Sequence, residues 1–375
     1  MAELIFFGHD AHDPAVQRRI KAFEQTGVSV RAFTMRRGPA FNAPWINIDL
    51  GETRDADFTQ RIGALIQAQP VLRARRDALK RAELYYARNL DMLALAHWAR
   101  RMSGSTAKLI YECLDVHRFM TRTDALGATM RGVERHLLAD VELVVVSSPA
   151  FVQEYFDARH PGRVRSVLVE NRLPPGFHYG PRPIEPPPRT GPIRIGWFGN
   201  LRCRRSFGLL LDLAERFPDR IELSFRGAPA RTEIDDFEAR IADLANVSFG
   251  GRYSWPEGLA RIYAAVDLVW AGDFHDPGAN SKWLLPNRLY EGGYYCAPPI
   301  APADSETGRW IEAQGAGFTL AEPLEETLPA FIASLDRARI SDVRAQLAAA
   351  PESTFVQPKD ELKDLLAAAL AGRAP

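Results

Sequence analysis

The chain has 375 residues, of which 46% are hydrophobic and 25% charged, and its formal net charge at pH 7 is zero. That length accommodates two domains of ordinary size, and no apolar run approaches the roughly 18 residues that a membrane-spanning helix needs. The N-terminal residues show no basic-then-apolar signal segment. Three widely spaced cysteines, Cys113, Cys203 and Cys296, suit neither a disulfide framework nor a zinc site. We therefore expect a cytoplasmic protein.

The zero net charge hides an asymmetry between the two halves. Residues 1–180 contain 25 basic and 20 acidic side chains, whereas residues 181–375 contain 22 and 27. Neither half has the basic excess expected of a nucleic-acid binder, so we predict no nucleic-acid partner.

The basic excess is concentrated between Arg73 and Arg101, where eight basic side chains meet three acidic ones. One interpretation is a peripheral surface that rests on anionic lipid, and the other is an ordinary solvated helix face. The apolar residues of the stretch either add to membrane binding or pack into the domain. They are Leu79, Leu84, Leu90, Leu93, Leu95 and Trp98.

Along the first half, short apolar runs rich in β-formers alternate with helical patterns, which is typical of βαβ units and a parallel sheet. We expect strands at 4–7, 28–33, 108–113, 141–147 and 165–169, and helices at 14–26, 76–102, 130–139 and 149–156.

From Pro174 to Pro192 the composition shifts to proline and glycine, which indicates a linker. Beyond it the alternation restarts. We expect strands at 193–198, 221–226, 247–249, 268–271 and 297–300, and helices at 207–217, 232–244, 256–264, 288–294 and 306–313.

The sequence therefore predicts two Rossmann-like doubly wound α/β domains, residues 1–173 and 193–350. A C-terminal helix in 351–375 follows and can pack back on the first domain. In such sheets ligands bind at the carboxyl ends of the strands. The default site is a cleft that both domains face.

One candidate anion site follows the strand at 193–198. Gly199-Asn200 leads there into the basic cluster Arg202, Arg204 and Arg205, just before a helix. Guanidinium groups and unpaired helix N–H groups that converge on one loop favour a phosphate. The alternative is an exposed arginine loop without a ligand.

A candidate hydroxyl site lies in the run Leu-Pro-Asn-Arg-Leu-Tyr-Glu-Gly-Gly at 285–293. The carboxylate of Glu291 can accept hydrogen bonds from two ribose hydroxyls, as the acidic residue of dinucleotide-binding folds does. The alternative is a surface glutamate that interacts favourably with the helix dipole.

Together these segments resemble the donor-binding domain of retaining GT-B glycosyltransferases of family 4. That family has two glutamates eight positions apart, and Trp283 stands here at the first position. The run 286–291, Pro-Asn-Arg-Leu-Tyr-Glu, fits a variant of the motif found in bacterial relatives. In that family the first glutamate usually contacts the transferred sugar.

The resemblance assigns roles to residues of the second half. It implies that Glu291 binds the ribose of the donor nucleotide. It also implies a diphosphate site at Arg202, Arg205 and Lys282, phosphate contacts from backbone amides near Leu285 and Asn287, and a nucleotide base near Arg226, Gly227 and Tyr253.

In the first half, the expected strand at 108–113 is followed by Asp115 and His117. An imidazole can carry a proton near neutral pH, and Asp115 can orient it or bind an acceptor hydroxyl. The resemblance places a His or Asp at this strand end close to the reacting sugar. Otherwise the pair is a helix cap and a polar loop. Near the start, Gly8-His9-Asp10 stands where relatives have a glycine-rich loop.

The resemblance implies that a hexosyl unit is transferred, with retention of configuration, from a nucleotide diphosphate sugar to a lipid-linked oligosaccharide. We expect a UDP-sugar donor and a site on the cytoplasmic face of the inner membrane. The stretch Tyr-Glu-Cys-Leu-Asp-Val-His at 111–117 and the later Glu170-Asn171-Arg172 resemble glycosyltransferases of bacterial exopolysaccharide assembly, including those of succinoglycan-type pathways. No Asp-x-Asp motif between apolar strands suggests a metal, so we expect neither metal nor other cofactor. Arginine and helix-dipole charge would stabilise the leaving diphosphate.

Two other functions remain open. A UDP-sugar epimerase of the same fold needs carboxylates around the sugar and no acceptor groove. A catalytically idle GT-B subunit would bind a partner enzyme, and the missing first glutamate favours this second alternative.

Overall fold

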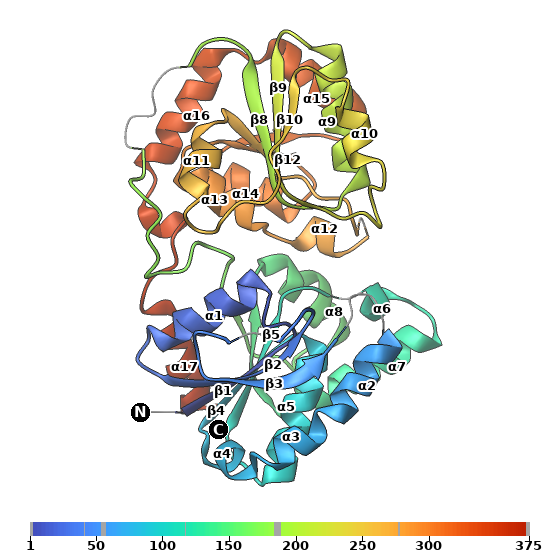
Figure 1. The fold of residues 1–375 in the computed structure, drawn as a ribbon, viewed down its shortest axis with the longest axis vertical. Helices are drawn as coiled ribbons and strands as arrows, with labels where there is room; N and C mark the ends of the chain where they lie inside the picture. Colours follow the sequence, from blue (N-terminus) through green and yellow to red (C-terminus); the bar gives the residue numbers. More distant parts are fainter. Residues whose placement is uncertain are drawn as a thin grey trace. The chain divides into compact units, whose positions relative to one another are not determined.

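The computed structural model describes residues 3–40, 42–53, 58–116, 118–183, 189–276 and 278–372. The chain divides into two compact units. The first comprises Met1–Glu170, Pro174–Gly176 and Pro358–Pro375, and the second comprises Asn171–Leu173 and Phe177–Gln357. Each unit has a parallel sheet with helices packed around it (Figure 1).

The sheet of the first unit has, in the described residues, seven parallel strands in the order β3-β2-β1-β4-β5-β6-β7. The strands are β1 (Glu3–Gly8), β2 (Ser29–Arg36), β3 (Asn47–Glu52), β4 (Leu84–Arg88), β5 (Lys108–Cys113), β6 (Val141–Val146) and β7 (Ser166–Leu168). The helices are α1 (Pro14–Glu24), α2 (Phe58–Gln67), α3 (Gln69–Arg73), α4 (Arg76–Arg81), α5 (Leu90–Ser103), α6 (Arg118–Thr121), α7 (Ala125–Leu138), the π-helical turn η1 (Phe151–Phe156), α8 (Asp157–Arg159) and α17 (Glu361–Ala371).

The C-terminal helix α17 belongs to this first unit. Its buried residues Leu362, Leu365 and Leu366 join the core cluster that contains Leu4 and Phe6 of β1. The chain thus enters the first unit again after the second is complete.

The expected long helix over residues 76–102 is wrong, because the chain forms strand β4 in its middle. All five residues of Leu84–Arg88 are buried, and the strand pairs with β1 on one side and β5 on the other. So short an apolar run between two helical patterns has no periodicity of its own that distinguishes strand from helix. Strand β3, at the edge of the sheet, was not predicted either.

The sheet of the second unit has six strands within the described residues, in the order β10-β9-β8-β11-β12-β13. The strands are β8 (Ile193–Leu201), β9 (Ile221–Pro229), β10 (Val247–Phe249), β11 (Leu268–Trp270), β12 (Pro299–Pro302) and β13 (Phe318–Leu320). The helices are α9 (Arg204–Arg216), α10 (Phe237–Ile241), α11 (Leu259–Ala264), α12 (Asn280–Trp283), α13 (Asn287–Tyr294), α14 (Glu306–Gln314), α15 (Leu324–Ser334), α16 (Arg337–Ala349) and the 3₁₀ turn η2 (Glu352–Thr354).

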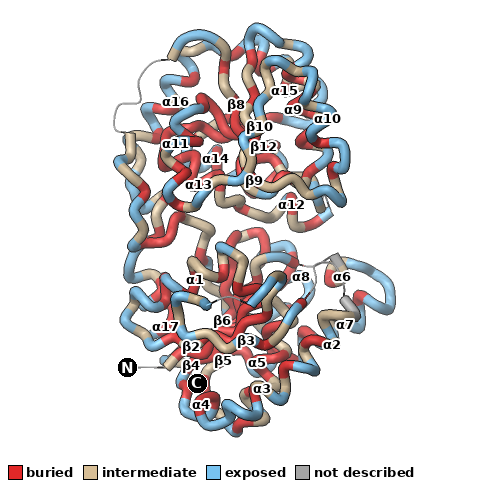
Figure 2. The backbone as a smooth tube through the Cα atoms, in the orientation of Figure 1, coloured by how far each residue is buried: buried red, intermediate tan, exposed pale blue. Residues whose placement is uncertain are grey.

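Both faces of this second sheet are covered. Trp197 and Phe198 follow one another in β8 and therefore point to opposite faces. Trp197 packs in one core cluster and Phe198 in another, and both are almost completely buried. Figure 2 shows the buried residues concentrated on the strands of each unit. Helices on both faces of a parallel sheet make the unit doubly wound.

The strand order reverses between β8 and β11, because the chain runs from β8 to β9 and β10 on one side and resumes at β11 on the other. Such a switch point opens a crevice at the carboxyl ends of the two strands, and ligands of α/β sheets bind there.

The second unit begins before residue 193. The ring of Phe177 lies 4.9 Å from that of Trp255, and the ring of Tyr179 lies 5.8 Å from that of Tyr294. These aromatic contacts attach residues 177–180, inside the predicted linker 174–192, to the second unit. Residues 184–188 of that segment lie outside the described part of the chain.

Candidate functional site

Arg288 connects the two strands that flank the switch point. Its guanidinium donates from Nη1 to the Phe198 carbonyl at 3.3 Å and from Nη2 to the Gly272 carbonyl at 3.4 Å. Phe198 lies in β8, and Gly272 lies just after β11. Only 9% of Arg288 is exposed, so a buried positive charge lies at the crevice. The 286–291 motif contains Arg288, but the sequence does not predict its burial at this position.

Asp273 provides a carboxylate beside this charge. Its Oδ1 accepts hydrogen bonds from the Ser281 hydroxyl at 2.7 Å and from the His275 backbone N–H at 2.9 Å. Its Oδ2 lies 3.9 Å from Nη2 of Arg288. Burial alone would raise the pKa of Asp273, but Arg288, these hydrogen bonds and the charge of Arg202 outweigh burial and lower it. Asp273 is therefore an anion at neutral pH.

The predicted phosphate loop joins β8 to α9. Cys203 caps the helix with Sγ, which accepts hydrogen bonds from the backbone N–H groups of Ser206 at 3.3 Å and Phe274 at 3.2 Å. The Ser206 hydroxyl donates to the Gly272 carbonyl at 3.3 Å. The loop is thereby fixed to the segment that follows β11, and α9 begins directly at the crevice.

The three predicted arginines do not all lie in the loop, because α9 begins at Arg204 and only Arg202 precedes it. They also differ in how far carboxylate partners balance their charges. Arg202 has no hydrogen-bond or ion-pair partner within the described part of the chain. Arg204 pairs with Asp235 at 3.1 Å. Arg205 pairs with Glu322 at 2.7 Å and Glu325 at 3.0 Å. Of the three, Arg202 has the guanidinium that is available for a ligand.

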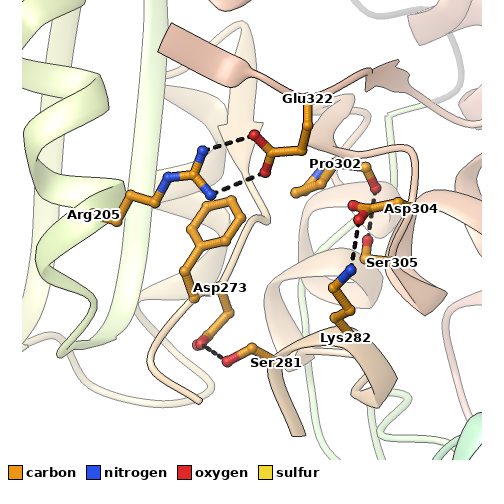
Figure 3. A pocket seen from close by; sticks show the side chains of 9 residues that line it. Arg205, Asp273, Ser281, Lys282, Pro302, Asp304, Ser305 and Glu322 are labelled. Carbon is orange, nitrogen blue, oxygen red and sulfur yellow. Dashed lines mark hydrogen bonds and ion pairs between the residues drawn. The ribbon is translucent and has the colours of Figure 1, made fainter. Parts of the chain in front are cut away.

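Arg205 and Lys282 line a pocket of about 200 Å³ (Figure 3). Lys282 pairs there with Asp304 at 2.7 Å, and Arg205 also stacks over the Phe274 ring at 4.5 Å. The pocket is lined by Arg205, Asp273, Phe274, Ser281, Lys282, Pro302, Asp304, Ser305 and Glu322. Because both cations already have carboxylate partners, their role as phosphate ligands stays a prediction that must compete with these ion pairs.

Glu291 is buried on α13 and is 4% exposed. Its Oε1 accepts a hydrogen bond from Nε1 of Trp255 at 3.2 Å, and its Oε2 accepts one from the Tyr263 hydroxyl at 2.9 Å. Burial, and next the charge of Glu291, raise the pKa of Tyr263 well above its usual range, so the phenol stays protonated and donates. Contact of Glu291 with a ribose stays a prediction, and it requires a shared acceptor or an exchange of partners.

The turn before α13 holds the predicted backbone phosphate contacts. Asn287 is the first residue of the helix, where N–H groups have no partner within the helix. Leu285 is buried, and its carbonyl accepts a hydrogen bond from Nδ2 of Asn171 at 3.1 Å. The hydrogen bond from Asn171 to the Leu285 carbonyl therefore fixes this turn in place.

The residues predicted near the nucleotide base lie around β9 and β10. Nη1 of Arg226 donates to the Gly250 carbonyl at 2.7 Å. Gly227 has φ +132°, and a Cβ there would lie 1.8 Å from the Gly199 carbonyl oxygen, so only glycine fits. Tyr253 packs against a core cluster of the second unit. Contact of these residues with a nucleotide base stays a prediction.

Of the predicted catalytic pair, Asp115 is exposed in the loop after β5. His117 lies outside the described residues. In the described part of the chain, no three His, Cys, Asp or Glu side chains gather as metal ligands would. None of its helices is both long and apolar enough to cross a bilayer.

Two doubly wound parallel units, the second with a cationic crevice at its switch point, define the GT-B fold of glycosyltransferases, as the sequence predicted. Anabaena Alr3699/HepE, solved in complex with UDP and glucose, superposes with a TM-score of 0.70 at 16% identity, over 98% of this chain and 99% of that one. Sucrose-phosphate synthase from Thermosynechococcus elongatus superposes with a TM-score of 0.74 at 14% identity, over 99% and 100%.

Sequence comparison identifies a narrower group of related proteins than the fold comparison does. No protein-family model matches the chain. The succinoglycan biosynthesis protein ExoL of Rhizobium meliloti (strain 1021) is 36% identical over 373 residues, which cover 98% of this chain and 93% of ExoL. The chain therefore belongs to the family of ExoL, and its fold is GT-B.

Proposed function

We propose that the protein transfers a hexosyl unit from a UDP-sugar to a lipid-linked oligosaccharide, with retention of configuration. The observation that carries the proposal is the crevice at the switch point, where the buried Arg288 and Arg202 both act on Asp273 and where the described residues give Arg202 no hydrogen-bond or ion-pair partner. A diphosphate carries the charge that such a pair of guanidinium groups complements. HepE was solved with UDP and with UDP-glucose, which supports a UDP-sugar as the donor.

In the proposed reaction, an acceptor oxygen bonds to the anomeric carbon as the bond from that carbon to the β-phosphate oxygen breaks. UDP leaves with the electron pair, and a β-phosphate oxygen takes the acceptor proton. Arg202 and the N-terminal end of α9 stabilise the charge that develops on the diphosphate. We propose that these groups act without a metal or other cofactor.

The proposal predicts that UDP and one UDP-sugar raise the melting temperature of the protein. A ligand at 100 times its dissociation constant stabilises a protein by about 2.7 kcal/mol. The donor identified in this way should label lipid-linked saccharide in membranes of a strain that lacks the gene. EDTA should not change the rate, and NMR of the product should show the anomeric configuration of the donor.

Each other outcome identifies an alternative. A second UDP-sugar that forms without acceptor would identify an epimerase. UDP binding without any transfer would identify an idle subunit. Loss of activity in EDTA would contradict the metal-free mechanism, and an inverted product would contradict retention.

We also propose peripheral binding to the cytoplasmic face of the inner membrane through the basic stretch. Four of its leucines do not contribute, because Leu79, Leu84, Leu93 and Leu95 are buried in the first unit. Basic side chains on α3, α4 and the turn between them are exposed, namely Arg73, Arg75, Arg76, Lys80 and Arg81. On the preceding helix α2, Ile62 and Ile66 are 45% and 60% exposed. The charge and the apolar contacts thus come from neighbouring helices.

Changing Arg75, Arg76 and Arg81 to Glu should abolish flotation with anionic vesicles at low salt. Each basic residue near an anionic surface contributes about 1 kcal/mol, and salt screens that attraction. Arg73 is left intact because its guanidinium stacks over Trp98 at 5.4 Å. Changing Arg135, Arg159 and Arg261, which are also exposed, alters the charge equally and serves as the control. Equal flotation of both triple variants would contradict the proposed surface.

A further inference from the structure

A histidine–aspartate pair lies at the carboxyl edge of the first sheet, in the loop from β1 to α1. Nε2 of His9 lies 3.0 Å from Oδ2 of Asp13, and Oδ1 of Asp13 accepts the backbone N–H of Ala15 at 2.7 Å. His9 is 8% exposed, and its Nδ1 has no hydrogen-bond partner among the described residues. One ring nitrogen is thus held by the protein, and the other is unsatisfied.

The tautomer of the His9 ring follows from its hydrogen bond to Asp13. Burial would raise the pKa of Asp13, but the hydrogen bond from His9 and the charge of Arg88 lower it far below its usual range. An ionised carboxylate can only accept hydrogen bonds, so Nε2 of His9 carries the proton. In the neutral imidazole, Nδ1 then presents a lone pair that can accept one.

A buried ionic network fixes α1 and the His9 loop in place. Arg19 on α1 donates from Nη2 to Oε1 of Glu112 at 2.9 Å, and Nε of Arg88 lies 3.4 Å from Oε2 of the same carboxylate. Nη1 of Arg88 also donates to the Ala15 carbonyl in the first turn of α1 at 2.7 Å. The loop therefore stands on a rigid base, which favours recognition of a defined ligand group.

The neighbouring strand end holds a second unusual residue. Asn89 directly follows β4 and has φ 76° and ψ 160°, a backbone conformation that is essentially restricted to glycine. Its side chain does not cap α5 and makes no hydrogen bond within the described residues. Such strain persists where the surrounding structure imposes it, and it is concentrated at functional sites.

The strand register brings these two residues to the same edge. Phe7 of β1 pairs with Ala87 of β4, so His9 and Asn89 each lie two residues beyond that paired position on adjacent strands. The exposed Asp115 follows β5, the next strand of the sheet. An unsatisfied acceptor and an uncommitted amide at one sheet edge match neighbouring hydroxyl groups of a pyranose.

We propose that His9 and Asn89 position the acceptor saccharide. Nδ1 of His9 accepts a hydrogen bond from an acceptor hydroxyl, and the Asn89 amide binds an adjacent hydroxyl. The assignment rests on the proposed function and locates its acceptor site in the first unit. Asp13 is the residue that holds the imidazole in the required tautomer.

The variant His9→Gln tests the roles of the two ring nitrogens of His9 separately. The glutamine amide can still donate to Asp13 in place of Nε2, but nothing replaces Nδ1. We expect KM for the acceptor to rise at least tenfold, while the melting temperature and KM for the UDP-sugar stay at wild-type values. The acceptor is the lipid-linked saccharide in membranes of a deletion strain, and the donor is the labelled UDP-sugar. His12→Gln, three residues away in the same loop, is the matched control.

Asn89→Gly tests the second residue, because glycine adopts its backbone conformation without strain. We expect an unchanged or higher melting temperature together with a higher KM for the acceptor. A residue with a purely structural role would raise the melting temperature and leave KM unchanged. That result, or wild-type acceptor KM in His9→Gln, would overturn the proposal even though transfer itself is observed.

Failure of the proposed function gives a different result. A wild-type protein that binds UDP-sugar and labels no membrane saccharide would overturn the function and this assignment with it. Loss of UDP-sugar binding in both variants would show instead that His9 and Asn89 stabilise the fold or contribute to donor binding.

Discussion

Replacing Glu291 by alanine is expected to lower the free energy of unfolding by about 3 kcal/mol, because two buried donors lose a charged acceptor and each such hydrogen bond is worth about 1.5–3 kcal/mol. The donors are Nε1 of Trp255 and the Tyr263 hydroxyl. If Glu291 also binds ribose, UDP affinity should fall by about 1–3 kcal/mol. Urea denaturation measures the first effect, and calorimetric titration with UDP measures the second.

Tyr263→Phe separates the two roles of Glu291. It removes the donor to Oε2 and leaves that oxygen available for a ribose hydroxyl, so UDP affinity should hold or rise while stability falls. In the double variant, the loss of stability should be smaller than the sum of the single losses, because both remove the same hydrogen bond. Wild-type UDP affinity in folded Glu291→Ala would contradict the ribose prediction and leave Glu291 a structural residue.

The sequence predicted the layers of the fold well, because alternation of apolar strands and amphipathic helices is a local signal. It failed at Leu84–Arg88, where five buried residues between two helices form β4. Burial there comes from pairing with β1 and β5, and the sequence distant from this run supplies both partners. A local sequence pattern cannot show that this run pairs with strands elsewhere in the chain.

Prediction of the site reached a similar limit. Residue order alone places Arg202 and Arg205 after a strand and before a helix, where phosphates bind. It does not reveal that Arg205 is paired with Glu322 and Glu325, which follow more than a hundred residues later. Arg288 illustrates the converse, since an arginine inside a motif looks exposed until the fold buries it against the carbonyls of Phe198 and Gly272.

The sequence does not predict the backbone conformation of Asn89 either. Asparagine tolerates positive φ in turns, but nothing in the run from Ala87 to Leu90 requires it. The structure imposes it, since the Asn89 N–H donates to the Glu112 carbonyl while its own carbonyl accepts from Leu93 in the first turn of α5.

Arg202→Ala is expected to reduce turnover about 100-fold, whereas Arg205→Ala should have a much smaller effect. Removing one preorganised donor from the charge that develops in a transition state costs about 10²–10³ in rate. In the described part of the chain Arg202 has no hydrogen-bond or ion-pair partner, so its guanidinium donors are available to the diphosphate. The charge of Arg205 is already balanced by two carboxylates.

The two variants are directly comparable because each change removes one guanidinium, from the loop before α9 in one case and from the first turn of α9 in the other. Steady-state transfer with saturating UDP-sugar measures kcat, and titration with UMP and UDP separates nucleoside contacts from those of the second phosphate. Arg202→Ala should lose affinity for UDP and keep affinity for UMP. If Arg205→Ala is instead the slower enzyme, then substrate must draw Arg205 away from Glu322 and Glu325. In that case Glu322→Gln together with Glu325→Gln should speed transfer, because the ion pairs would compete with the donor for the same guanidinium.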